Sequence, residues 1–108
     1  MRSVLVIQNE RLLGAGIERL LRREVDLRVI GATVEDEGAL LRAISCARAD
    51  VVVLDEATTD SARLLAVLDH HPKLRVLLVS ANDGLVRTYE ARQVMVTQAT
   101  ELVDLVMS

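Results

Sequence analysis

The chain has 108 residues, about the usual size of one domain and enough to bury a core without disulfides. Hydrophobic residues make up 51% of it, but its only aromatic side chain is Tyr89, so the core must be aliphatic. The net charge of −3 comes from charges of both signs with no basic stripe, which argues against direct binding of nucleic acid.

Targeting and redox signals are also informative. No apolar run approaches the roughly 18 residues that a membrane span needs, and no signal-peptide pattern occurs at the start. The single cysteine, Cys46, cannot form an internal disulfide, which fits a reducing compartment. We therefore expect residues 1–108 to form one cytoplasmic domain, with no membrane partner and no output domain among them.

The first 80 residues alternate between short apolar runs and amphipathic segments. Four largely apolar runs predict strands, at Val4–Ile7, Leu27–Ala32, Val51–Leu54 and Leu74–Val79. The continuous run Val4–Ile7 is typical of a strand buried on both faces, and Val51–Leu54, the most apolar run, is expected to be the central strand. The segments between them predict helices, whose inward stripes are Leu13, Ile17, Leu20 and Leu21; Leu40, Ala43, Ile44 and Ala47; and Leu64, Leu65 and Leu68. The second helix spans about Asp36–Arg48 and the third Asp60–His71, where Pro72 ends it. This alternation predicts an α/β fold with a parallel sheet covered on both faces.

The pattern weakens after the turn signal Asn82-Asp83-Gly84. Val94–Val96 predicts a fifth strand, and Thr97 can cap a last helix that runs to Met107. The intervening residues 81–93 are too few for the usual crossover, which needs a dozen or more residues, mostly helical. They leave room for a single helical turn or a short edge strand after the turn.

Polar residues follow several of these strands. Gln8 and Asn9 come after the first, Asp55 after the third and Ser80 after the fourth. In an open parallel sheet, ligands bind outside the carboxyl ends of the strands. We therefore expect these four residues to share one edge of the sheet.

This arrangement resembles the receiver domain of two-component response regulators, and most closely receivers that precede helix-turn-helix output domains. The resemblance covers nearly the whole chain and rests on three stretches, VLVIQNERLLGAGIERLLRREVDLRVIGAT, ADVVVLDE and HPKLRVLLVSAND. It implies a flavodoxin-like three-layer sandwich with a five-stranded parallel sheet, in which the crossover between strands 4 and 5 is shortened.

The resemblance also implies roles for the polar residues. Active receivers have two acidic residues after the first strand that hold Mg²⁺, a phospho-accepting Asp after the third, a Ser or Thr after the fourth and a Lys after the fifth. By position, Asp55 takes the acceptor place and Ser80 the hydroxyl place. The acidic pair falls on Gln8 and Asn9, and the lysine place falls near Thr97.

These substitutions remove charge from the site. Phosphoryl transfer depends on metal ions and cations that neutralise the transferred group, and Mg²⁺ prefers carboxylate oxygens. Only Glu10 remains near the first strand as a weak acidic helper. We therefore expect a vestigial phospho-acceptor site with no catalytic residue, no metal and no cofactor, in which Asp55 serves as a polar strand end that caps a loop.

The last helix carries more apolar residues than one stripe on a sheet requires. Leu102, Val103, Val106 and Met107 of this helix, with Val94 of the fifth strand, are the expected interface for a homodimer or for another signalling protein. The alternative is that the helix packs on both the sheet and the first helix.

Three functions follow from these observations. The first is a degenerate receiver, a transcription-associated regulatory module that acts by dimerisation or docking. The second is a single-domain response regulator still phosphorylated on Asp55 with the help of Mg²⁺. The third is a binding module that resembles anti-sigma-factor antagonists, with Ser61 as the modified residue. The third is disfavoured because such domains begin with antiparallel strands. No nucleophile–base pair, glycine-rich phosphate loop or zinc spacing indicates an enzyme.

Overall fold

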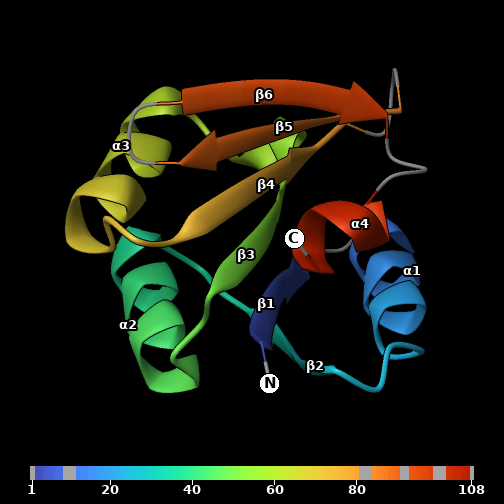
Figure 1. Cartoon of the computed structure of the whole chain (residues 1–108). Helices are drawn as coiled ribbons and strands as arrows, with labels where there is room; N and C mark the ends of the chain where they lie inside the picture. The colour runs from blue at the N-terminus through green and yellow to red at the C-terminus, as the bar shows by residue number, and fades with distance from the viewer. Residues whose placement is uncertain (1, 9–11, 81–83, 91–92, 99–101, 108) are drawn as a thin grey trace.

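The computed structural model describes residues 2–8, 12–80, 84–90, 93–98 and 102–107; for residues 12–15 and 93–97 it describes the backbone alone. These residues form an α/β fold around one sheet (Figure 1). Its elements in chain order are β1 (Arg2–Gln8), α1 (Leu12–Leu21), β2 (Leu27–Thr33), α2 (Glu37–Ala47), β3 (Val51–Asp55), the 3₁₀ helix η1 (Glu56–Thr58), α3 (Ser61–His70), β4 (Arg75–Val79), β5 (Leu85–Glu90), β6 (Gln93–Gln98) and α4 (Leu102–Met107).

The sheet has six strands in the order β2-β1-β3-β4-β5-β6. The first four strands along the chain pair in parallel, as the sequence predicts. β5 pairs antiparallel with β4, and β6 pairs antiparallel with β5. The predicted α/β fold is therefore confirmed, and four of the strands are parallel as predicted. The prediction of five parallel strands is wrong, because the sheet has six strands and the last two are antiparallel.

The additional strand is β5, which occupies the segment that is too short for a crossover helix. Gly84 adopts a left-handed conformation with φ of 68° just before it, and this allows the chain to reverse. The Ser80 N–H donates to the Leu85 carbonyl at 3.0 Å and closes the hairpin. The sequence allowed a short edge strand in this segment. β5 lies inside the sheet instead, and β6 forms the edge.

Two hydrophobic clusters lie on the two faces of the sheet. One contains Ile17 and Leu21 of α1 with Leu102 and Val106 of α4. The other contains the buried stripes of α2 and α3. Figure 1 accordingly shows α1 and α4 together on one side of the sheet and α2 and α3 on the other. The central strands contain continuous apolar runs, Val4–Ile7 in β1 and Val51–Leu54 in β3, because both of their faces are covered.

The helical stripes are narrower than the sequence predicts. Leu20 is 39% exposed and Leu65 is 60% exposed, although both were expected to face inward. In α3 the buried residues are Leu64 and Val67, three positions apart. A short helix on a flat sheet buries one narrow stripe, so the flanking leucines remain at the surface.

The last helix is also shorter than predicted. α4 begins at Leu102, whereas Thr97 lies within β6 as the register partner of Val86 and therefore does not cap a helix. No helix within the described ranges is long and apolar enough to cross a membrane.

Candidate functional site

The strand order places a candidate site at the carboxyl ends of β1 and β3. From β1 the chain moves outward to β2 on one side, and then returns to place β3 on the other side. Such a reversal opens a crevice between the two strand ends, where ligands of open α/β sheets bind. Gln8 ends β1 and Asp55 ends β3, so both lie at this position.

Asp55 is buried, with 7% of its surface exposed. One carboxylate oxygen, Oδ1, accepts a hydrogen bond from the Ala57 N–H at 2.9 Å. The Thr58 hydroxyl donates to the Asp55 carbonyl at 3.2 Å. Asp55 thereby caps η1 and helps to hold the loop that follows β3.

Ser80 lies at the neighbouring strand end. Asp55 is the register partner of Val79, and Ser80 is the next residue along the chain. Ser80 is 8% exposed, and its N–H belongs to the hairpin described above. The structure thus brings Asp55 and Ser80 to adjacent strand ends, as the sequence predicts, and buries both.

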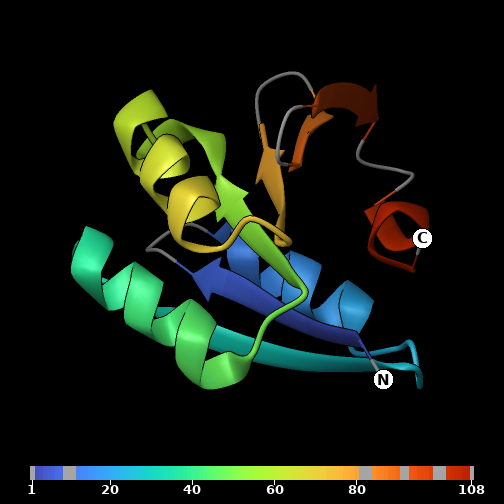
Figure 2. The same ribbon diagram turned by 60° about the vertical axis from the view of Figure 1, so that its left-hand side comes forward.

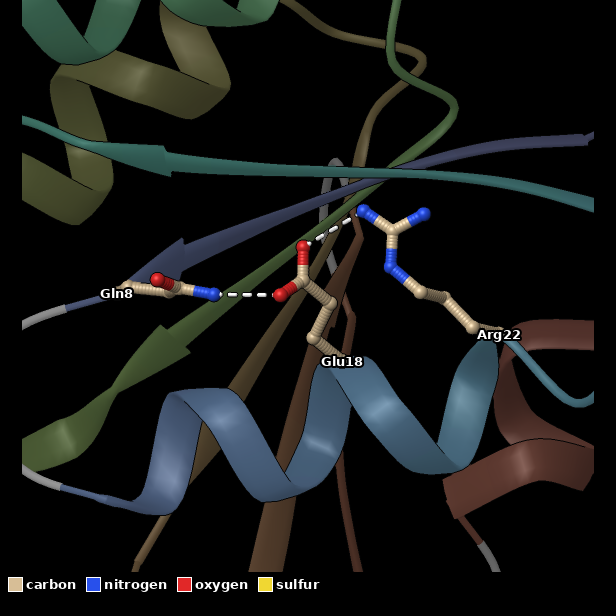
Figure 3. Close-up of polar contacts among 3 residues, drawn as sticks. All are labelled: Gln8, Glu18 and Arg22. Atoms are coloured by element: carbon tan, nitrogen blue, oxygen red, sulfur yellow. Dashed lines mark hydrogen bonds and ion pairs between the residues drawn. The ribbon is translucent and has the colours of Figure 1, made fainter.

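Gln8 contacts α1 through its side chain (Figure 3). Its Nε2 donates to Oε2 of Glu18 at 2.6 Å, and Oε1 of Glu18 accepts from Arg22 at 2.9 Å. Gly31 on β2 leaves space for the Glu18 carboxylate, because a Cβ at position 31 would lie 2.2 Å from Oε1 of Glu18. The hydrogen bond to Glu18 therefore directs the side-chain amide of Gln8 toward α1.

Sequence reasoning missed this polar group. The spacing of Glu18 and Arg22, four residues apart on a helix, is a sequence signal for their ion pair. Nothing local links Glu18 to Gly31, since the contact between them exists only once α1 packs beside β2.

Thr97 does not reach the site. The register runs from Asp55 through Val79 and Val86 to Thr97, so β4 and β5 separate β3 from β6. With about 4.8 Å between neighbouring strands, the Thr97 backbone lies about 14 Å from that of Asp55. We expected the strand that contains Thr97 to lie directly beside β4. Because β5 lies between them, the distance from Asp55 to Thr97 is one strand spacing longer than expected.

A cation near this rim comes instead from β5. Arg87 Nη1 lies 2.5 Å from Oε1 of Glu56, the residue after Asp55. Both side chains are about one-third exposed. Arg87 is the register partner of Leu78, which belongs to the cluster under α2 and α3. The ion pair ties β5 to η1, and it was not predictable without knowing that residues 85–90 form a strand.

The described residues do not fit a Mg²⁺ site. Within the ranges that the structure describes, no three His, Cys, Asp or Glu side chains gather in a group that could hold a metal ion. Among the described strand ends, β3 contributes the carboxylate of Asp55 and β1 the amide of Gln8, whereas Mg²⁺ requires several oxygen ligands in near-octahedral geometry. Asn9 and Glu10, the other candidates, lie outside the described residues.

The expected interface on the last helix needs correction. Leu102 is 3% exposed and Val106 is fully buried, because both pack on the sheet in the same cluster as α1. Val103 packs partly against that cluster, and Met107 is 40% exposed. Leu102 and Val106 thus belong to the core, as the two-sided packing alternative expects. Val94 lies in β6, where the backbone alone is described.

Comparison of the chain with family models, with curated proteins and with solved structures gave no match. The resemblance to receiver domains therefore stays a prediction, carried by the residues and by their arrangement at the sheet edge.

Proposed function

We propose that this chain is a non-catalytic regulatory module of cytoplasmic signal transduction, a degenerate receiver with a flavodoxin-like fold. It works by binding a second copy or another signalling protein, without Mg²⁺-dependent phosphorylation of Asp55. The observation that carries this proposal concerns the described residues of the rim: Gln8 stands in the place of an acidic residue, and no three His, Cys, Asp or Glu side chains among the described residues gather to hold a metal ion beside Asp55 and Ser80.

A phosphoryl group adds nearly two negative charges at pH 7, and enzymes that transfer it balance this charge with metal ions and fixed cations. In the place of the first acidic residue stands Gln8, whose amide donates to Glu18. The strand that would carry the lysine is displaced, and Arg87 already pairs with Glu56.

The second candidate is phosphorylation of Asp55, with Ser80 as the switch hydroxyl. It has one specific observation in its favour, which is that both residues are buried at adjacent strand ends. Burial restricts access of a phosphodonor, and the capping bond to Ala57 engages one carboxylate oxygen.

The third candidate, an anti-sigma-factor-antagonist-like module, has less support. Ser61 is the exposed first residue of α3, as that reading needs. The parallel pairing of β1 with β2 argues against it, since such modules begin with antiparallel strands.

The experiment that separates the first two candidates is incubation with acetyl phosphate and Mg²⁺, followed by intact-mass measurement. We expect the wild-type mass to stay unchanged over hours. The matched control is Asp55→Asn, which lacks the acceptor oxygen chemistry. A phosphoryl adduct on the wild type that is missing from Asp55→Asn would overturn the proposal and establish the second candidate.

A further inference from the structure

A cavity of about 680 Å³ lies at the amino ends of the parallel strands. Among its lining residues, Arg2 begins β1, Asp50 precedes β3 and Arg75 begins β4. Figure 2 shows β1, in dark blue, and β3, in green, beginning at the end of the sheet where the N-terminus is marked. Asp55 and Ser80 lie at the opposite ends of β3 and β4, so the cavity is separate from the candidate site. Its volume is typical of small-molecule sites, which measure about 300–1,000 Å³.

The lining of the cavity carries more positive than negative charge. Its cations are Arg2, Lys73 and Arg75, and its acids are Asp50 and Glu90. This local excess of positive charge occurs in a chain whose net charge is −3. A recess lined by an excess of one sign of charge concentrates ligands of the opposite sign, so the cavity favours an anion.

Arg75 and the two acids are held by contacts within the protein. Oδ2 of Asp50 accepts a hydrogen bond from the Ser3 N–H at 2.8 Å, which joins the starts of β1 and β3. Oε1 of Glu90 accepts from Nε of Arg75 at 2.6 Å. Nη1 of Arg75 donates to the Leu105 carbonyl, so this guanidinium is committed to α4 and β5.

Arg2 and Lys73 are the cations available to a ligand. Within the described ranges, no hydrogen bond or ion pair joins either side chain to another residue. The turn that carries Lys73 is closed by a hydrogen bond from the Leu74 N–H to the His71 carbonyl at 3.0 Å, and this fixes the backbone of Lys73 at the rim. Because only β3 separates β1 from β4, the two cations reach the cavity from strand starts about 10 Å apart.

We propose that this cavity binds a small hydroxylated phosphomonoester, a sugar or polyol phosphate, whose phosphate group is held by Arg2 and Lys73. A phosphomonoester carries nearly two negative charges at pH 7 on one tetrahedral group, which suits two cations that approach from different sides. The guanidinium fork binds two phosphate oxygens, and the ammonium group binds as a point charge. A carboxylate carries one charge and is satisfied by a single guanidinium.

The rest of the lining indicates the remainder of the ligand. The carboxylates of Asp50 and Glu90 retain acceptor capacity for hydroxyl groups, since a carboxylate accepts several hydrogen bonds. Tyr89, the only aromatic residue of the chain, packs in the cluster under α2 and α3, so no aromatic side chain can stack a nucleobase in the cavity. A sugar or polyol phosphate fits these groups better than a nucleotide. The inference goes beyond the proposed function and does not depend on it.

The test is a titration with glycerol 3-phosphate in the absence of Mg²⁺, followed by backbone amide NMR shifts. The wild type is compared with Arg2→Gln/Lys73→Gln, and the matched control is Arg23→Gln/Arg28→Gln, which removes the same charge at exposed positions outside the cavity. Lys73→Gln alone, at an exposed turn position, gives a second variant should the double change destabilise the fold, which thermal unfolding checks. Succinate, a dianion without phosphate, is titrated in parallel.

We expect saturable shifts at residues 72–75 and at Asp50, with an affinity about tenfold lower in Arg2→Gln/Lys73→Gln, reduced in the same direction in Lys73→Gln, and unchanged in the control. A wild type that shows no saturable shifts would overturn the proposal. So would an equal loss of affinity in the control, which would indicate only general surface charge, or shifts centred on Asp55 and Ser80. Succinate that binds as tightly as glycerol 3-phosphate would overturn the assignment of a phosphate ligand.

Discussion

The parallel part of the molecule, β1 to β4 with α1, α2 and α3, differs in its construction from the C-terminal part, β5, β6 and α4. Every residue of β3 is buried, and the middle of β1 is buried as well. β5 alternates instead, with Val86 and Thr88 buried and their neighbours half-buried. A strand that is covered on both faces has a continuous apolar sequence, whereas a strand with one well-covered face alternates between buried and less buried residues.

The C-terminal part is also held by fewer groups. α4 buries only two side chains, Leu102 and Val106. Arg75 reinforces it from β4: its Nη1 donates to the Leu105 carbonyl at 2.6 Å, and its Nε donates to Glu90 of β5 at 2.6 Å. One guanidinium thus links the added strand, the last helix and the parallel part.

A buried polar side chain, Thr88 of β5, also affects the stability of this region. The hydroxyl of Thr88 is inaccessible to solvent and has no hydrogen-bond partner among the residues that the structure describes, and Thr88 is 3% exposed. A buried polar group without a partner costs about 1–3 kcal/mol of stability. We therefore expect the C-terminal part to open more readily than the parallel part.

The largest effect should come from core truncations in the two parts. Leu5→Ala in β1 removes a side chain that is 1% exposed and should lower the free energy of unfolding by about 3–5 kcal/mol. Leu102→Ala in α4 should cost about 2–3 kcal/mol, because a short terminal helix can shift to fill the space. Hydrogen exchange provides the measurement: Leu5→Ala should lower protection throughout, and Leu102→Ala mainly in β5 and α4.

The control for this pair is Met107→Ala, which alters a half-exposed side chain of the same helix and should change stability by about 0.5 kcal/mol or less. Equal loss of protection across the chain in Leu102→Ala would show that the two parts unfold together, and would remove the distinction drawn above.

An intermediate effect should follow from two glycine substitutions. Gly84→Ala forces a Cβ into a left-handed conformation at the entrance to β5, so it should destabilise the protein by about 1–2 kcal/mol. Gly16→Ala lies in α1 with open space around the added atom, so it should stabilise by about 0.5–1 kcal/mol. Urea unfolding of both variants measures the difference. A Gly84→Ala variant that is as stable as the wild type, or more stable, would contradict the left-handed conformation at Gly84.

The smallest effect should be a gain. Thr88→Val replaces the unpartnered hydroxyl with a methyl group of similar shape, so it should raise the free energy of unfolding by about 1 kcal/mol. Thr33→Val, at an exposed position of β2, serves as the control and should be nearly neutral. A destabilised Thr88→Val, measured by urea unfolding beside the control, would mean that the hydroxyl has a partner in solution.

Sequence reasoning succeeded where local chemistry is decisive. The predicted second helix, Asp36–Arg48, matches α2 with its two caps: the Asp36 carboxylate accepts from the Ala39 N–H at 2.7 Å, and Arg48 ends the helix with φ of 50°. The reversal between β4 and β5 was predicted in the same way, from the turn signal Asn82-Asp83-Gly84; Gly84 has φ of 68°, and the other two residues lie outside the described ranges.

It failed where the outcome depends on what lies beside a segment. Leu65 fits an apolar stripe, but the sheet beneath α3 covers only one side of that helix. Thr97 is a good helix cap by residue type, but β5 provides a strand for it to pair with instead. At the candidate site, sequence placed Asp55 and Ser80 at one edge but gave no sign that Gln8 would bond to Glu18.

The sequence by itself determined the alternating strands and helices up to Val79, and it placed the polar residues that end two neighbouring strands, because these depend on periodicity and on turn chemistry. The tertiary structure alone decided that β5 runs antiparallel inside the sheet, that β6 forms its edge, and which groups meet at the rim. The physical reason is that a strand's direction and neighbours are set by contacts with segments distant in the chain, which local patterns do not encode.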